Sequence, residues 1–506
     1  MYYSPTNEYA SFEGINEPMR SPEQVLDNTI QRCRERNIII PTYREMADPT
    51  LVPDAIRREL AEVGLWDLHS RNLFRISWKN EPVKTGGGFG GVNFVELPSE
   101  LTGVEARIFM LLGKYFPTGA HKVGATFGPL VEKLVRGAFD PTTQKALWPS
   151  TGNYCRGGAY DAHLLACPSI AVLPEGMSRE RFEWLEEMGS EIFATPGSES
   201  NVKEIYDKTK ELQAERGDEV VVLNQFAEFG NAVWHYVCTG KAMEEVFGAV
   251  READSRFAGV CLTQGSAGTL GCAEYLREIF PRTKVVAAEA LQCPTLLSGG
   301  YGSHRIEGIG DKHVPWIHNI KTTDVVAGID DQACMSLLRL FNESEGRTHL
   351  KSRGVDPAVV DQLDLLGISG IANLLTAIKT ARFFEMGRKD MIFTVATDSM
   401  ELYGSRFEEE RELHGAYTET SAAVHFDRYL LGTGIDHMLE LGYWDRKRIH
   451  NLKYFTWVEQ QGKTVEELDA QWYDDDYWTT HFHAWEEWDE KITEFNERTG
   501  LLERYS

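Results

Sequence analysis

The chain has 506 residues, room for about two to four domains and a large core, which excludes a peptide hormone or a small module. With 42% hydrophobic and 25% charged residues, its composition is that of an ordinary globular protein. A net charge of −25 repels phosphate backbones and anionic membranes, so neither nucleic acid nor a membrane is expected as a partner.

The N-terminal residues 1–84 are polar, and their apolar positions predict helices over 22–36 and 53–71. They contain no signal peptide pattern, and no run in the chain reaches the ~18 apolar residues needed to span a bilayer. Eight widely spaced cysteines without a CxxC pair indicate reduced thiols. We therefore predict a cytoplasmic protein with a helical N-terminal extension.

From about residue 90 to 405, short apolar runs alternate with helical stretches. The runs predict strands over 169–174, 191–195, 220–224, 259–263, 284–289 and 391–396, and the stretches predict helices over 179–188, 199–216, 231–249 and 269–279. Such an alternation predicts an α/β core in two lobes, with parallel sheets covered by helices on both faces. Ligands bind such sheets at the carboxyl ends of the strands.

A glycine-rich turn connects the strand predicted over 259–263 to the helix predicted over 269–279. Small side chains there leave backbone N–H groups open beside a helix N-terminus, which suits a phosphate, and a plain tight turn is the alternative. The residues of the turn are Gly265, Ser266, Ala267, Gly268 and Thr269. The turn matches neither the Walker pattern nor GxGxxG.

Lys122 lies among small and apolar residues, at the predicted start of a helix. Desolvation lowers the pKa of an amine, as a Schiff-base lysine requires, although a single lysine of this kind can equally be structural.

Two more loops precede helical stretches. Ser150, Thr151, Gly152 and Asn153 offer hydroxyl and amide groups that can hold a carboxylate or donate to a phenolate. Ser369 opens an apolar helix. Simple helix capping is the alternative for both loops.

Taken together, these four loops resemble the fold-type II pyridoxal-phosphate enzymes, specifically the cysteine synthase and cystathionine β-synthase group. Three more segments follow in the same order: 225–240 with Gln225-Phe226 and Asn231, 304–310 with the sequence HRIEGIG, and Thr397-Asp398-Ser399. The resemblance covers roughly residues 85–405. It implies a catalytic core with a small lobe over about 120–240 and a large lobe over about 85–119 and 241–405, and a homodimer or higher homo-oligomer.

The resemblance also implies a role for each matching residue. Lys122 would bind pyridoxal 5′-phosphate covalently, Asn153 would contact its phenolic oxygen, and Ser369 would face its pyridine nitrogen. The turn residues Gly265, Ser266, Ala267, Gly268 and Thr269 would hold its phosphate. The substrate would contact Ser150, Thr151, Gly152, Tyr154 and Gln225.

A neutral serine beside the pyridine nitrogen makes the ring a weaker electron sink than a carboxylate would, which disfavours transamination. We therefore expect β-elimination or β-replacement on a β-substituted L-amino acid such as cysteine or O-acetylserine, through aminoacrylate, with Lys122 as the base. A threonine or serine dehydratase of the same fold is the first alternative, and a catalytically silent scaffold protein is the second.

Some residues depart from the cysteine synthase pattern. His121, within Gly-Ala-His-Lys, resembles the tryptophan synthase β-subunit, but Ser150 replaces the acidic residue of that subunit's substrate loop, so indole activation is not expected. Tyr154 stands where cysteine synthases usually have a small threonine, which changes the pocket. Arg156 could pair with a second anionic group on the substrate or simply be a solvated helix residue.

The C-terminal residues 406–506 are acidic and rich in tryptophan. Residues 407–506 carry 23 acidic and 10 basic residues and six of the twelve tryptophans, which favours a folded appendage over a disordered arm. The spacing of Trp485, Trp488, Ile492 and Phe495 predicts an amphipathic helix ending near Gly500. Histidines 481 and 483 do not share a helix face, so no metal site is expected.

Overall fold

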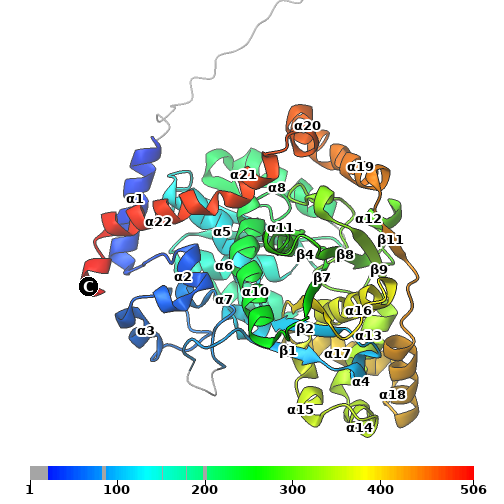
Figure 1. Ribbon diagram of the computed structural model, residues 1–506. Coiled ribbons are helices and arrows are strands. Elements are labelled where there is room, and N and C mark those ends of the chain that lie inside the picture. The colour runs from blue at the N-terminus through cyan, green and yellow to red at the C-terminus, as the bar shows by residue number, and fades with distance from the viewer. Residues whose placement is uncertain (1–20, 83–86, 151, 178, 198–201, 506) are drawn as a thin grey trace, which may run out of the picture.

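Two β-sheets flanked by helices organise the chain (Figure 1). The computed structural model describes residues 21–82, 87–150, 152–177, 179–197 and 202–505. The predicted α/β fold with two mainly parallel sheets is confirmed. The residue boundaries proposed for the lobes and extensions stay a prediction.

The smaller sheet is parallel throughout, with the strand order β5-β4-β3-β6. Its strands are β3 (Lys145–Pro149), β4 (Ser169–Pro174), β5 (Glu191–Thr195) and β6 (Val220–Val222). They alternate with helices α6 (Asn153–Leu164), α7 (Arg179–Glu187) and α8 (Val202–Arg216). Strand β4 is buried at every position, because helices cover both faces of a parallel sheet.

The larger sheet has the order β1-β2-β10-β7-β8-β9-β11. Its strands are β1 (Phe94–Leu97), β2 (Arg107–Leu112), β7 (Arg256–Thr263), β8 (Lys284–Ala290), β9 (Val325–Ile329), β10 (Asp390–Ala396) and β11 (Met438–Glu440). The inner strands are parallel, whereas the edge strands β1 and β11 are antiparallel to their neighbours. Strands β1, β2, β3, β9 and β11 are not among the predicted elements.

Helices bury both faces of the larger sheet. Alternate side chains of β7 point to opposite faces. Val260 joins a core cluster that includes Leu276 of α11 (Gly271–Ile279), and Cys261 joins the cluster beneath α13 (Asp331–Asn342) and α16 (Ile368–Phe383). This two-sided burial explains why the strand sequence is apolar without alternation.

Most predicted elements are present within one to three residues, and two helices differ. The helix predicted over 53–71 is wrong beyond Leu60: α3 (Asp54–Leu60) ends before a turn in which Gly64 N–H donates to Asp67 Oδ2 at 2.7 Å. The helix predicted over 231–249 is instead α9 (Phe229–Trp234) and α10 (Gly240–Val250), joined by a π-helical turn, His235–Thr239. Residues 199–201 of another predicted helix lie outside the described residues.

The two ends of the chain pack against each other. Helix α1 (Pro22–Arg36) lies beside α22 (Trp485–Thr499) in Figure 1. The Asp489 carboxylate accepts hydrogen bonds from the backbone N–H groups of Tyr43 at 2.6 Å and Arg44 at 3.2 Å. The Asn496 side chain exchanges two hydrogen bonds with the backbone of Ile40. The N-terminal extension and the tail thus stabilise each other.

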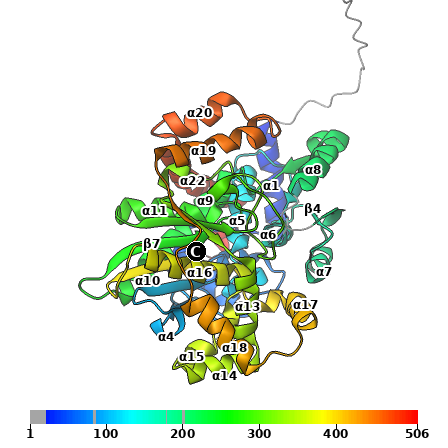
Figure 2. The ribbon, with the colours of Figure 1, turned by 90° about the vertical axis from the view of Figure 1, so that its right-hand side faces the viewer.

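The acidic tail is folded, as predicted. It contains helices α17 (Gly404–His414), α18 (Glu419–Phe426), α19 (Tyr443–Lys453), α20 (Val465–Tyr473), α21 (Tyr477–His483) and α22, which ends at Gly500 as expected. Figure 2 shows α19, α20 and α22 at one end of the molecule and α17 and α18 at the other. Between them, β11 completes the edge of the larger sheet.

Buried side chains of the tail hold the loop that follows α12 (Thr295–Ser298). The Lys453 ammonium donates to the carbonyls of Trp316 at 2.9 Å and His318 at 2.8 Å, and Trp457 Nε1 donates to Val314 O at 2.8 Å. Because the preceding part of this loop lines the cavity described below, the tail supports that cavity from outside.

Two tryptophans of the tail provide a matched test of this packing. Trp488 is 5% exposed and packs beside Tyr43, whereas Trp444 is 80% exposed. Trp488→Ala should lower the free energy of unfolding by about 3–5 kcal/mol through the cavity it leaves, and Trp444→Ala should change it by less than about 0.5 kcal/mol. Urea denaturation measures both. Equal losses in the two variants would contradict the packing of α22.

Within the described part of the chain, no helix is long and apolar enough to cross a membrane, and no group of three potential metal ligands comes together. All eight cysteines are buried and free.

Candidate active site

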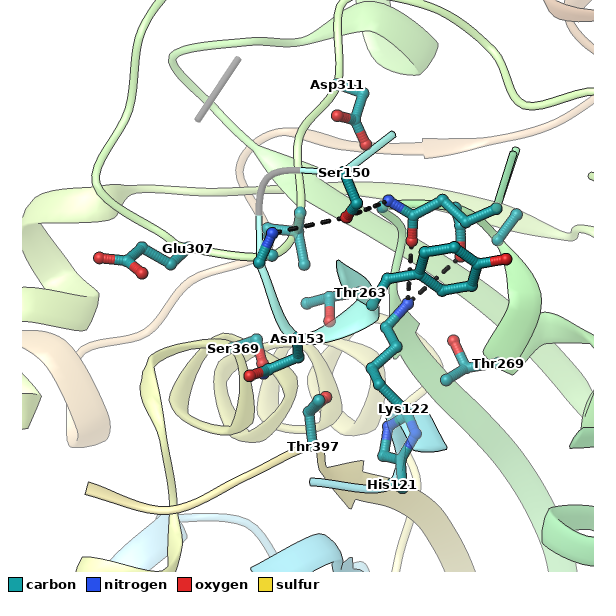
Figure 3. A pocket seen from close by; sticks show the side chains of 18 of the residues that line it. His121, Lys122, Ser150, Asn153, Thr263, Thr269, Glu307, Asp311, Ser369 and Thr397 are labelled. Carbon is teal, nitrogen blue, oxygen red and sulfur yellow. Dashed lines mark hydrogen bonds between the residues drawn. The ribbon is translucent and has the colours of Figure 1, made fainter. Parts of the chain in front are cut away.

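A cavity opens where strands of both sheets end and helices begin (Figure 3). Residues that follow β3 and β6 form one side, and residues at the ends of β7 and β10 form the other. The first turns of α5 (Lys122–Val135), α6 and α16 complete the lining. This is the position at which ligands bind α/β sheets.

The Lys122 side chain extends into this cavity from the start of α5 (Figure 3). Its Nζ lies 3.3 Å from Ser266 Oγ and 3.5 Å from Gln225 Oε1, both within hydrogen-bond range. Burial lowers the pKa of the Lys122 amine to about 8, against the opposing effect of the Asp311 carboxylate. About a tenth of the amine is therefore unprotonated and nucleophilic at pH 7, far more than for an ordinary lysine.

The glycine-rich turn after β7 is as tight as the sequence implies. A Cβ atom on Gly268 would lie 2.0 Å from Asn231 Oδ1, and one on Gly265 would lie 2.5 Å from Gly308 O. Ala267 has a left-handed backbone with φ of 64°. Neighbouring groups therefore approach the backbone of this turn closely, and its N–H groups lie before α11, where a helix N-terminus favours an anion.

Ser150 and Gln225 form the wall opposite Ser369. Gln225 Nε2 donates to Ser150 Oγ at 3.0 Å (Figure 3). The same Ser150 oxygen accepts a hydrogen bond from Gly152 N–H at 3.4 Å. Tyr154 is 1% exposed, lines the cavity, and has no hydrogen-bond partner for its hydroxyl among the described residues. Its ring narrows the space that a small residue would leave.

Asn153 begins α6 and is held by a buried carboxylate. Its Nδ2 donates to Asp398 Oδ2 at 2.5 Å, and the Tyr403 hydroxyl donates to the same oxygen at 2.7 Å. Burial raises the pKa of Asp398 to about 6, against the lowering effect of these two hydrogen bonds. An asparagine amide has two N–H groups, so the second is available to a ligand.

His121, directly before Lys122, is fully buried beside Trp78 and His235. Burial and the adjacent Lys122 lower the pKa of His121 to about 3, so its ring is neutral. Neither ring nitrogen has a hydrogen-bond partner among the described residues. A neutral ring adds no charge beside the Lys122 amine.

The cavity brings together most of the residues singled out from the sequence. Those lining it are Lys122, Ser150, Gly152, Asn153, Tyr154, Gln225, Gly265, Ser266, Ala267, Thr269 and Ser369. Gly268 belongs to the same turn, where its N–H donates to Ser266 Oγ at 3.3 Å, and Thr151 lies outside the described residues. Their individual roles stay predictions.

The lining also includes residues to which no role was given from the sequence: Thr263, Glu307, Asp311, Val395 and Thr397. Asp398 acts on the site through Asn153. Glu307 and Asp398 lie inside two segments that carry the family resemblance, 304–310 and 397–399. Their place in these segments is the sequence feature that could have indicated a position near the site. A carboxylate's partner on another element cannot be read from its own segment.

The chain is similar to proteins of known family. The sequence profile described as "Pyridoxal-phosphate dependent enzyme" matches residues 87–352, more than half of the chain. The chain belongs to this family. The protein is therefore an enzyme, and its cofactor is pyridoxal 5′-phosphate.

Relatives place this family member near the cysteine synthases, as the sequence resemblance implied. A cysteine synthase from Staphylococcus aureus is 28% identical over 315 residues, covering 62% of this chain and 93% of the relative. A cystathionine beta-synthase from Saccharomyces cerevisiae is 27% identical over 263 residues, half of each chain. The O-acetyl serine sulfhydrylase isoform 3 from Entamoeba histolytica shares the fold, with a TM-score of 0.55 and 23% identity over 68% of this chain and 94% of its own.

The cavity fits the family's cofactor on three observations. The turn 265–269 is tight enough that only glycine fits at positions 265 and 268, and its open backbone suits a phosphate. The Lys122 amine is buried at hydrogen-bond distance from this turn. Buried polar atoms beside it, Asn153 Oδ1 and the Tyr154 hydroxyl, have no protein partner among the described residues, which is what a polar ligand would leave.

Proposed function

We propose that the protein catalyses β-elimination or β-replacement on a β-substituted L-amino acid. The observation that carries the proposal is the position of the Lys122 amine, buried, with a lowered pKa, and in contact with Ser266 and Gln225. The cysteine synthase relatives support the same reaction class.

Within this proposal, Lys122 holds the cofactor through its amine, and the turn 265–269 holds the phosphate. When bound, pyridoxal phosphate supplies the electron sink that makes the substrate α-proton acidic. Ser369, 4% exposed on the first turn of α16, provides a hydroxyl and no negative charge at the pyridine side. This favours loss of a β-substituent over transamination.

The remaining steps belong to the chain's own side chains. Ser150, Gly152 and Gln225, together with Thr151 by resemblance, bind the substrate carboxylate and orient the Cα–H bond. The Lys122 amine would take the α-proton as the general base. The buried walls around Tyr154 exclude water, so the fate of the product depends on whether a second nucleophile can enter.

The test is to incubate the purified holoenzyme with L-cysteine, O-acetyl-L-serine, L-serine, L-threonine and L-cysteate, with and without added sulfide. Pyruvate and ammonia from a β-substituted substrate support elimination, and a new sulfur amino acid supports replacement. 2-Oxobutyrate from threonine as the main product would replace the proposal with a dehydratase, and no product from any substrate with the cofactor bound would indicate a silent scaffold. A homodimer or higher homo-oligomer and a cytoplasmic location stay predictions.

A further inference from the structure

A second cavity lies beside the candidate active site. Its walls include Trp66, Asn153, Arg156, Arg181 and Trp184. Asn153 lines both cavities, so the two are neighbours at the first turn of α6. Arg156 follows Asn153 by three residues, which places the two side chains on the same face of that helix.

Arg156 is a buried cation held by aromatic rings. It is 7% exposed, and its guanidinium lies over the rings of Trp184 and Trp66, at 4.0 and 5.5 Å from their centroids. The two rings pack edge to face, and Tyr160 stacks on Trp184. Cation–π contacts with two rings stabilise the guanidinium charge but supply no oxygen acceptor for its N–H groups.

No carboxylate pairs directly with Arg156, although the charge of the buried Asp398 acts on it from farther away. In the part of the chain that the structure describes, it forms no ion pair, and its Nε has no hydrogen-bond acceptor. By contrast, Arg181 in the same wall pairs with the buried Glu307 at 2.7 Å, and Glu307 also pairs with Arg406. A buried guanidinium without an anion is costly, and a ligand anion would remove that cost.

The acidic side chains that line this cavity do not form an ion pair with Arg156. Glu183 and Glu401 pair with Arg179 and Lys114, each at 3.2 Å, and they are 63% and 54% exposed. Glu187 is also exposed to solvent. Exposed carboxylates are well solvated and compensate a buried charge weakly.

We propose that Arg156 binds an anionic group carried by the β-substituent of the substrate, such as a sulfonate, phosphate or carboxylate. This inference rests on the proposed function, because it places the amino acid's own carboxylate at Ser150 and Gln225 and its side chain toward Arg156. When the Cβ–substituent bond breaks, its electron pair leaves with the departing group, and Lys122 takes the α-proton. Arg156 therefore faces a negative group both before and after the bond breaks.

The experiment compares the holoenzyme with Arg156→Met, which keeps length without charge, and Arg156→Lys, which keeps charge without the planar fork. Paired substrates are L-cysteate against L-cysteine, and O-phospho-L-serine against O-acetyl-L-serine, so that sulfonate and phosphate are separated. Arg156→Met should lower kcat/KM for the anionic member of the preferred pair by about 10- to 100-fold, mainly through KM, and leave the neutral member unchanged. Arg156→Lys should restore part of the loss.

The control is Arg179→Gln, which removes the same charge from a side chain that is 83% exposed on the neighbouring helix α7. It should change neither substrate ratio. Circular dichroism and thermal unfolding check that each variant is folded. If Arg156→Met does not fold, the ratio of kcat/KM for the anionic and neutral substrates is compared between Arg156→Lys and the wild type instead.

Binding measured by calorimetry separates this inference from the proposed function. If neutral substrates turn over and the wild type shows no preference for either anionic partner, the anion site is overturned and the proposed function stands. If nothing turns over, the proposed function fails. In that case weaker binding of L-cysteate or O-phospho-L-serine to Arg156→Met still supports the site, and equal binding overturns it.

Discussion

Replacing Lys122 with alanine is expected to lower turnover by about 10³-fold or more, because we propose this one amine as both cofactor anchor and general base. Burial holds the pKa of this amine near 8, so no exposed lysine of the chain can substitute for it at neutral pH. Product release in a steady-state assay measures the loss. The absorbance of the bound cofactor should lose its lysine-dependent band in the same variant.

Folding should survive the Lys122→Ala change. The Lys122 side chain is partly buried and, among the described residues, its amine makes two long hydrogen bonds, at 3.3 and 3.5 Å, so its removal also removes a desolvation cost. We expect an unfolding temperature equal to or above that of the wild type. Lys203→Ala, at a side chain 75% exposed on α8, is the matched control and should keep full activity. Substantial turnover in Lys122→Ala would contradict the assignment of this residue.

The second large effect is expected from one methyl group in the phosphate turn. Gly268→Ala would place its Cβ 2.0 Å from Asn231 Oδ1. Asn231 cannot step aside without loss, because its Nδ2 donates to Gln225 O at 2.9 Å and Ser266 Oγ at 3.0 Å. The turn must therefore shift, and the cofactor's dissociation constant should rise by about 10- to 100-fold.

Titration of the cofactor-free protein with pyridoxal phosphate, followed by absorbance, measures this change. Gly248→Ala is the matched control, since nothing lies within 4 Å of a Cβ at that position in α10. It should bind the cofactor as the wild type does, and its helix should be slightly more stable because alanine favours helix over glycine. Equal affinities of the two variants would rule out the turn as the phosphate site.

Local pattern predicted the elements whose burial is two-sided. Strands β4 and β8 are apolar at consecutive positions because helices cover both faces, and that run is visible without knowing which helices do so. The short or edge strands β1 and β11 lack such a run, since pairing to one neighbour decides their conformation. The error beyond Leu60 has a local cause, because the turn closed by Gly64 N–H and the Asp67 carboxylate follows the helix and was not recognised in the sequence.

For the site, the order of small motifs along the chain was enough to predict which residues line one cavity, although Thr151 lies outside the described residues. Partners on distant elements were not predictable. Asp398 holds Asn153 across 245 positions of sequence, and Arg156 packs against both Trp66 and Trp184. The sequence alone therefore did not distinguish an anion-binding Arg156 from a solvated helix residue.

The sequence by itself determined the family resemblance and the candidate site residues of this protein: a lysine among small residues, a glycine-rich turn before a helix, and Ser369 at the start of another helix. These are local because a nucleophile and a phosphate cradle each need only a few adjacent residues. The tertiary structure decided the rest. It desolvated the Lys122 amine, packed Arg156 against two aromatic rings, and folded the tail against the loop after α12. Burial, and with it pKa and unpaired charge, depends on neighbours that folding alone brings together.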